Sequence, residues 1–549
     1  MLAVSTIIKL HSLAFNMSTI QQIALLSLLA VLGNASPIIP RSNEAEVKPP
    51  ITWVNCSEAI PLPIQQANIT LPGTLPESLK CGIINVPLDY SKPMCETNNL
   101  NISFAFNSVN SKHGLLAYNA GGPGEEVQSY AWGLAGIPIE QSDHVAGLEE
   151  FDFLAMDTRG TWASNALSCP EPDFYAPIAP PKTQEEYETL SKNVKNYTSL
   201  CAENSLPKGI FEHVGSDAVA QDLESLREVL GYDKLNYLGY SYGTIYGQEY
   251  LNRFADKAGQ FVLDGVATVS ISNYDIVNHQ GRAFDRLIER ADKWCQSNND
   301  TCPLAALGNG SVPATFKQVM EQYANSTDTP SADIAGLLSI GLFSGNPLFE
   351  SFTGALALAA TGNTSALHYT DDFAAAFTQS SLSATLPTLC SDFKVDNPSW
   401  EGYNDLIEKV HHNDKYGGSD GIFYLAIAMC ASFPTVGTSD LKWRYTNVTD
   451  HPTLLATSDY DLNTPTELTD VTRQYNPNST MLVRHGDDHG SFFVPGPVRD
   501  AMLAYFYNAT IPAPCEGDVH SVYAVGTNRT GIVDPYVAPI GEVAGDVIE

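Results

Sequence analysis

The chain has 549 residues, of which 44% are hydrophobic, so it is long enough for a sizeable core and longer than one simple domain. Its 29 basic and 62 acidic residues give a formal net charge of −33. Nucleic acid and anionic membrane surfaces would repel such a chain, so neither is expected as a partner.

The N-terminal segment has the pattern of a secretion signal. An apolar run from Ile23 to Leu32 precedes Gly33-Asn34-Ala35, whose small residues favour cleavage after Ala35. The run is shorter than the roughly 20 residues that span a bilayer. We therefore predict a signal peptide at 1–35, with the start at Met1 or Met17, and a secreted, extracellular protein without stable membrane insertion.

The glycosylation sequons and the cysteines also favour a secreted protein. The ten cysteines are even in number, as disulfides require, and their spacing matches no zinc site. N-glycans are expected on the Asn-x-Ser/Thr sequons at Asn55, Asn68, Asn101, Asn196, Asn299, Asn309, Asn325, Asn363, Asn447, Asn478, Asn508 and Asn528. Other connectivities stay open, but the predicted disulfides are Cys56–Cys81, Cys169–Cys201, Cys295–Cys302 and Cys390–Cys430, which leaves Cys95 and Cys515.

The first part of the predicted core, 36–267, alternates strands with helices. Strands are predicted at 83–88 and 102–106, and four short apolar runs at 114–119, 151–156, 235–238 and 261–263 are typical of buried parallel strands. The helical stretches between the runs indicate βαβ crossovers. One such helix is predicted to start with Ser216 as its N-cap and to stop at Gly231.

Two loops of this part contain candidate catalytic residues. Gly239-Tyr240-Ser241-Tyr242-Gly243 lies between a predicted strand and a predicted helix at 244–254, which is the arrangement of the nucleophile elbow in α/β-hydrolases. Asn119-Ala120-Gly121-Gly122-Pro123-Gly124 follows the first parallel strand, where that fold places an oxyanion loop. Ser241 is therefore the candidate nucleophile, and backbone N–H groups of Tyr242 and of Gly121 or Gly122 are candidate oxyanion donors.

The pattern becomes helical between 268 and 445, for example at 332–342 and 354–360, and strands return at 453–456 and 481–483. We predict a helical cap insertion at 268–445, a second core part at 446–515 and a tail at 516–549 without clear periodicity. Asp461 and His489 each follow a returning strand in the order Ser, Asp, His. They are the candidate acid and base, with Asp459 and His485 as alternatives.

These motifs occur together and in order, along with Met156-Asp157-Thr158-Arg159-Gly160 and Asp461-x-x-Thr464-Pro465. The chain thereby resembles the prolyl iminopeptidase and tripeptidyl aminopeptidase group of α/β-hydrolases, over roughly residues 52–515. Cys390-Ser391-Asp392 further resembles its secreted branch. The resemblance implies an α/β-hydrolase fold, a mostly parallel sheet flanked by helices, with a cap. It also implies a Ser241, Asp461 and His489 triad, with structural roles for Asp157 and Arg159.

The predicted function is a secreted serine hydrolase that releases short N-terminal peptides through an acyl-enzyme, with no cofactor or metal. A carboxylate that recognises the free substrate amine is expected, from Glu125, Glu126 or Asp392. One alternative is a carboxylesterase or lactonase with the same triad. Another is a non-catalytic hydrolase fold used for binding, against which the complete Ser-Asp-His set argues.

Overall fold

The computed structural model describes residues 50–525, with gaps at 68, 140–143, 171–179, 325, 327–348, 366–381, 414, 417–421, 436, 440, 442–450, 487–488 and 513–520. The predicted signal peptide, Cys515, the predicted helix at 332–342 and most of the predicted tail lie outside the described residues. Within the described ranges, none of the helices has the length and apolar character needed to cross a bilayer.

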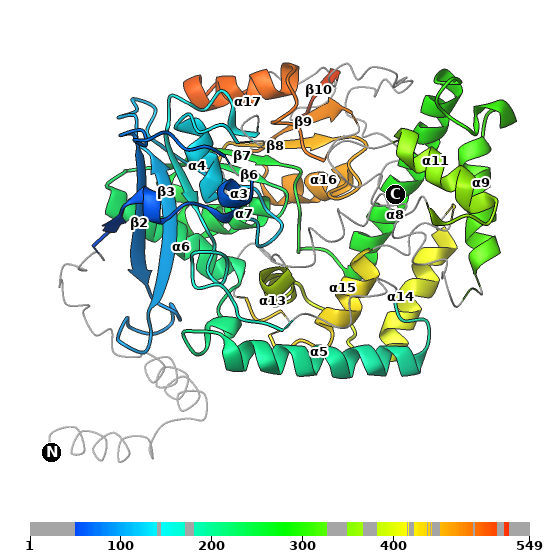
Figure 1. Cartoon of the computed structure of the whole chain (residues 1–549), viewed down its shortest axis with the longest axis horizontal. Coiled ribbons are helices and arrows are strands. Elements are labelled where there is room, and N and C mark those ends of the chain that lie inside the picture. Colours follow the sequence, from blue (N-terminus) through cyan, green and yellow to red (C-terminus); the bar gives the residue numbers. More distant parts are fainter. Residues whose placement is uncertain are drawn as a thin grey trace, which may run out of the picture. The chain divides into compact units, whose positions relative to one another are not determined.

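The described strands form one ten-stranded sheet (Figure 1). Its order is β1-β2-β3-β5-β4-β6-β7-β8-β9-β10. Pairing is antiparallel from β1 to β5 and parallel from β5 through β10. The predicted mostly parallel sheet is thus confirmed. The strands are β1 Thr52–Val54, β2 Leu79–Val86, β3 Leu100–Asn107, β4 Leu115–Asn119, β5 Asp152–Met156, β6 Leu235–Tyr240, β7 Ala258–Asp264, β8 Thr453–Ser458, β9 Thr480–His485 and β10 Ser521–Val525.

Helices cover both faces of this sheet. Successive strand residues point to opposite faces, so Leu115 and Ala117 of β4 belong to one apolar cluster while Leu116 and Tyr118 belong to another. On the sheet, the first cluster includes residues of α6 and α7, and the second includes residues of α4 and α17. The helix α5 also belongs to the first cluster but lies apart from the strands (Figure 1). These helices are α4 Gln128–Leu134, α5 Gln184–Asn204, α6 Ser216–Leu230, α7 Gly243–Phe254 and α17 Pro497–Asn508. The sequences of the parallel strands are continuous apolar runs because both faces of these strands are buried.

The start of α6 differs from the prediction. Gly215 occupies the N-cap position and Ser216 is the first helical residue. Ser216 does not cap the helix because its hydroxyl donates a hydrogen bond to Asp392, far away in the sequence. The predicted end is confirmed, since Gly231 adopts a left-handed conformation with φ of 86°.

The described elements between β7 and β8 are helical, and we call them the inserted helices. They are α8 Asn273–Ser297, α9 Ser311–Tyr323, α11 Phe349–Ala360, α13 Leu382–Asp392, α14 Trp400–Asn413 and α15 Ile422–Cys430, with one short 3-10 turn at Ala305–Leu307. The helix expected at 354–360 is confirmed as part of α11. The exact bounds of the insertion, 268 and 445, stay a prediction. After β8, α16 Thr466–Tyr475 leads to β9.

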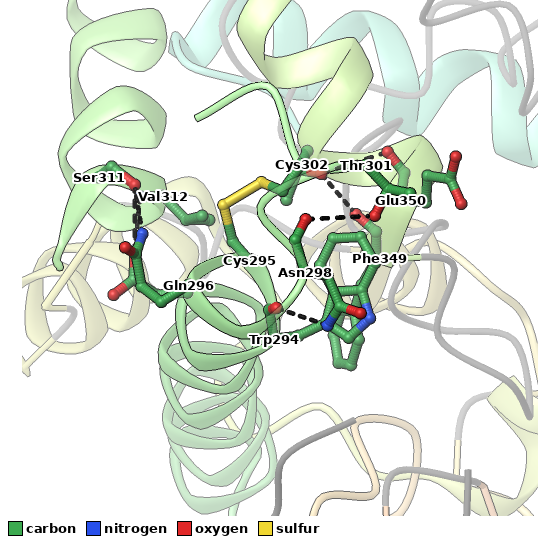
Figure 2. The surroundings of a disulfide bond; sticks show 12 residues. Trp294, Cys295, Gln296, Asn298, Thr301, Cys302, Ser311, Val312, Phe349 and Glu350 are labelled. Atoms are coloured by element: carbon green, nitrogen blue, oxygen red, sulfur yellow. Dashed lines mark hydrogen bonds between the residues drawn. A yellow bond between two sulfur atoms is a disulfide. The ribbon is translucent and has the colours of Figure 1, made fainter. Parts of the chain in front are cut away.

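An apolar cluster of its own joins α8, α9 and α11. Figure 2 shows the Cys295–Cys302 disulfide that links the end of α8 to the segment before α9. The Trp294 ring of α8 packs against the Phe349 ring of α11, with centroids 6.1 Å apart. This part of the insertion therefore has a core of its own, which also includes Tyr460 from the loop after β8.

All four predicted disulfides are present. Cys95 is an exposed free thiol. Two strands were not predicted. The three-residue β1 pairs antiparallel with β2, and β10 lies in the sequence assigned to an aperiodic tail and pairs in parallel with β9. At five residues β10 is too short to show a period of its own.

Candidate active site

The candidate nucleophile lies in a sharp turn between β6 and α7. Ser241 has φ of 53°, in the left-handed region that non-glycine residues rarely adopt. The turn brings strand and helix backbones together, because a Cβ at Gly239 would lie 2.6 Å from the Gly243 carbonyl oxygen. The Ser241 N–H donates to the Asp264 carbonyl at 2.9 Å. Ser241 keeps part of its surface accessible, as a nucleophile requires.

The candidate acid, Asp461, lies three residues beyond β8 and is fully buried. The backbone N–H groups of Asn463 and Thr464 donate to Oδ1 at 2.8 and 2.9 Å. The Thr464 hydroxyl and the Gly490 N–H donate to Oδ2 at 2.9 and 3.2 Å. These donors stabilise a carboxylate and fix its orientation.

The candidate base, His489, directs Nδ1 at this carboxylate. Nδ1 lies 2.8 Å from Oδ2 and 3.0 Å from Oδ1 of Asp461. Because an ionised carboxylate only accepts hydrogen bonds, we infer that Nδ1 carries the proton. Nε2 is then left as the acceptor, which is the tautomer that a general base needs.

The alternative residues occupy other places. Asp459 is buried and accepts a hydrogen bond from the Gly486 N–H at 3.0 Å, whereas Asp461 is the acid that contacts His489. His485 is the last residue of β9, and its side chain is outside the described part of the structure.

Two buried residues that the sequence analysis did not single out hold the histidine loop. Asp264, at the end of β7, accepts from the N–H groups of Ser491 and Phe492 at 2.8 and 2.6 Å. Its own carbonyl receives the Ser241 N–H, so Asp264 connects the nucleophile turn to the segment after His489. Arg484 donates to the Gly490 carbonyl at 3.0 Å. Burial lowers the pKa of Arg484 to about 10, so it stays cationic at neutral pH.

The glycine-rich loop lies against the nucleophile turn. A Cβ at Gly121, where φ is 93°, would lie 2.7 Å from the Tyr242 nitrogen and 2.9 Å from Ser241 Cβ. The Gly121 N–H donates to the Asn119 side chain at 2.9 Å, so that donor is already used. Of the two glycines, Gly122 is therefore the better candidate to act with Tyr242. Its N–H has no recorded acceptor among the described residues.

The three predicted amine-binding acids differ in environment. Glu125 is exposed, yet desolvation by the surrounding protein raises its pKa. Glu126 is buried and accepts the Ser129 N–H at 3.1 Å, near the start of α4. Burial, followed by repulsion from Asp157, raises its pKa.

Asp392 is fully enclosed and engaged. It accepts from the Ser216 N–H at 3.0 Å, the Ser439 hydroxyl at 2.6 Å, the Tyr242 hydroxyl at 2.7 Å and the Ser216 hydroxyl. Both oxygens are thereby occupied, and we do not retain Asp392 as a group that meets substrate.

The predicted structural residues also have defined partners. The Arg159 guanidinium makes a buried bidentate pair with Asp222 of α6, at 2.6 and 2.8 Å. Asp157 accepts from the Gln128 side chain at 2.6 Å and from the Ala163 N–H at 3.2 Å. These contacts hold the loop after β5 beside the glycine-rich loop, where the Trp162 indole donates to the Gly124 carbonyl at 2.9 Å.

A mostly parallel sheet, a sharp serine turn directly after a strand and an Asp–His pair on later loops are the arrangement of an α/β-hydrolase. The α/β hydrolase fold family model matches residues 121–495, and the chain belongs to that family.

Particular relatives are also similar. Serine protease Hip1 of Mycobacterium tuberculosis is 30% identical over 285 residues, which are 51% of each chain. Tripeptidyl aminopeptidase of Streptomyces lividans is 29% identical over 287 residues, 50% of this chain and 52% of that one. The match thus spans about half the length of these curated relatives. It confirms the predicted resemblance to the tripeptidyl aminopeptidase group.

Among solved structures, the α/β hydrolase MGS-M2 from a deep-sea metagenome library is 13% identical with a TM-score of 0.32. The match covers 75% of this chain and 95% of that one.

Proposed function

We propose that this protein is a serine peptidase that removes short peptides from the free N-terminus of its substrates. The observation that carries the proposal is the buried Asp461–His489 pair, 2.8 Å apart. Asp264 joins the segment after His489 to the Ser241 turn. The peptidase names of the two relatives support the choice of substrate class.

The proposed reaction follows the chemistry of serine triads. Ser241 Oγ attacks the peptide carbonyl carbon while His489 Nε2 accepts the hydroxyl proton. The N–H groups of Gly122 and Tyr242 stabilise the oxyanion of the tetrahedral intermediate. His489 then gives the proton to the leaving amine as the C–N bond breaks, which leaves an acyl-enzyme. Water attacks the ester in the same way and releases the N-terminal peptide.

Glu125 is the residue that we propose binds the substrate amine. It is the acid of the three that solvent can reach, and its Cγ lies 3.1 Å from the position of a Cβ on Gly122. A carboxylate at this place can pair with a substrate ammonium group that lies near the glycine-rich loop. Glu126 and Asp392 are less suitable because both are buried with backbone or hydroxyl donors.

The test compares tripeptide substrates with free and acetylated amines. Truncating one partner of a desolvated charge pair costs about 2–4 kcal/mol. Acetylation should therefore lower kcat/KM on the order of 30- to 1000-fold, at about tenfold per 1.4 kcal/mol. Glu125→Gln should reduce this discrimination, while Glu126→Gln serves as the matched control and should keep it. Equal rates on both substrates would contradict the exopeptidase and favour the esterase.

We also propose that the protein is secreted and N-glycosylated. The four disulfides support an oxidising compartment. The described sequon asparagines are all exposed, as glycan attachment requires; they are Asn55, Asn101, Asn196, Asn299, Asn309, Asn363, Asn478 and Asn508. Loss of mass on treatment of the secreted protein with an N-glycosidase tests this proposal, and an unchanged mass would contradict glycosylation.

A further inference from the structure

We propose that one inserted helix, α13, positions both sides of the oxyanion hole, and that Asp392 is a positioning residue for the chemical step. The inference rests on the proposed function, because it concerns the same reaction. It assigns to the insertion a part in catalysis itself, in addition to the selection of substrates that a cap provides.

The first contact is made at the nucleophile turn. Asp392 Oδ2, at the end of α13, accepts the hydroxyl hydrogen of Tyr242 at 2.7 Å. Tyr242 is the residue directly after Ser241, and its backbone N–H is one of the two proposed oxyanion donors. Its ring is buried against Tyr246, with centroids 5.6 Å apart. Holding both the ring and the hydroxyl limits the rotation of the Tyr242 backbone.

The second contact is made at the glycine-rich loop. The Thr385 hydroxyl, two helical turns before Asp392, donates to the Pro123 carbonyl at 2.6 Å. Pro123 follows Gly122, whose N–H is the other proposed oxyanion donor. The hydrogen bond to the Pro123 carbonyl therefore restrains the loop next to Gly122. The two segments that carry the proposed oxyanion donors, the Tyr242 turn and the glycine-rich loop, are thus bonded to the same helix.

The helix itself is firmly attached. Cys390 is joined to Cys430 of α15. Asp392 also receives the Ser216 N–H at 3.0 Å and the Ser439 hydroxyl at 2.6 Å. These bonds tie α13 to the start of α6 in the hydrolase core. A carboxylate with so many donors is rigid, which suits a group that positions another residue.

This arrangement predicts a specific kinetic effect. Oxyanion donors act on the transition state, and removing one costs about 10²- to 10³-fold in kcat. Displacing a donor costs less than removing it. Loss of the Asp392–Tyr242 contact should therefore lower kcat about 10- to 100-fold and leave KM within about twofold.

The experiment measures kcat and KM on an activated p-nitrophenyl ester, together with the affinity of a peptidyl boronate that forms a tetrahedral adduct. The variants are Asp392→Asn, Tyr242→Phe, their combination, and Thr385→Val. The matched control is Asp292→Asn, since Asp292 is also a buried acid of the inserted helices. It accepts the Gly310 and Val312 N–H groups at 2.7 and 2.9 Å, away from the oxyanion loop.

The proposal expects kcat and boronate affinity to fall together in each test variant, with the double variant no worse than the single ones. The control should lose stability and keep its kcat. If Asp392→Asn does not fold, Tyr242→Phe decides the question, because it leaves Asp392 its other partners. Folded variants with normal kcat would overturn the inference alone. A wild-type protein that neither hydrolyses the ester nor reacts with a fluorophosphonate would refute the proposed function as well.

Discussion

Replacing Asp461 by asparagine should disable catalysis through the wrong histidine tautomer. Two backbone N–H groups, of Asn463 and Thr464, point at Oδ1 at 2.8 and 2.9 Å. We expect the asparagine amide to keep its oxygen there, because Oδ2 meets only one backbone N–H group among the described residues, the more distant one of Gly490 at 3.2 Å, and a Thr464 hydroxyl that can rotate. Its NH2 group then lies at the Oδ2 position, facing His489 Nδ1. Nδ1 then has to accept a hydrogen bond, so the ring proton moves to Nε2 and the base can no longer take a proton from Ser241.

The magnitude follows from other serine triads, in which this exchange lowers kcat by about 10⁴. At about 1.36 kcal/mol per tenfold, the transition state is destabilised by roughly 5 kcal/mol. The assay is kcat on a p-nitrophenyl ester, with circular dichroism to check that the variant is folded.

Asp459→Asn is the matched control, because Asp459 is equally buried and is the alternative acid. Its amide oxygen can still accept the Gly486 N–H, so we expect a loss below about tenfold. The reasoning is refuted if Asp461→Asn stays active while Asp459→Asn is inactive.

Three further predictions concern the surroundings of the site. Gly121→Ala should abolish activity even in a folded protein, because its Cβ would lie 2.6 Å from the Tyr240 carbonyl oxygen at φ of 93°; an active Ala variant would contradict the geometry of the loop. Burial raises the pKa of Glu126 above its ordinary 4.5, so its contribution to stability is complete below that value and is lost as pH rises through the raised pKa. Urea denaturation at pH 5 and pH 8 should therefore show a smaller pH difference for Glu126→Gln than for the wild type, and equal differences would contradict the assignment. Arg286→Met leaves the buried Glu467 carboxylate without its partner 2.7 Å away and should cost about 3–5 kcal/mol of unfolding free energy. Adding Glu467→Leu should restore most of it, and a double variant as unstable as the single one would argue against the ion pair.

The sequence predicted the parts of the site that depend on local backbone shape. The Ser241 turn needs glycines on either side, and buried parallel strands need continuous apolar runs, so both leave a clear pattern. Asp461 and His489 could be placed because each follows such a strand. The same logic missed β10, which is short and follows a segment without periodicity.

The parts that sequence could not supply depend on contacts between distant segments. From the sequence, Asp392 is one of three candidates for the acid that binds the substrate amine, since nothing local to residue 392 reveals that Ser216 and Tyr242 enclose it. Asp264 had no motif of its own, although it joins the nucleophile turn to the histidine loop. Thr464 was visible as part of the Asp461-x-x-Thr464-Pro465 motif, but its hydrogen bond to the acid appears only in the structure.

The most direct test of the account is covalent labelling of the purified protein with a fluorophosphonate, followed by peptide mass spectrometry. A serine becomes reactive toward this probe when a base activates it beside an oxyanion hole. The account predicts a single adduct on Ser241, which disappears in Ser241→Ala and is strongly slowed in His489→Ala. An unlabelled wild-type protein, or an adduct on another serine, would contradict it.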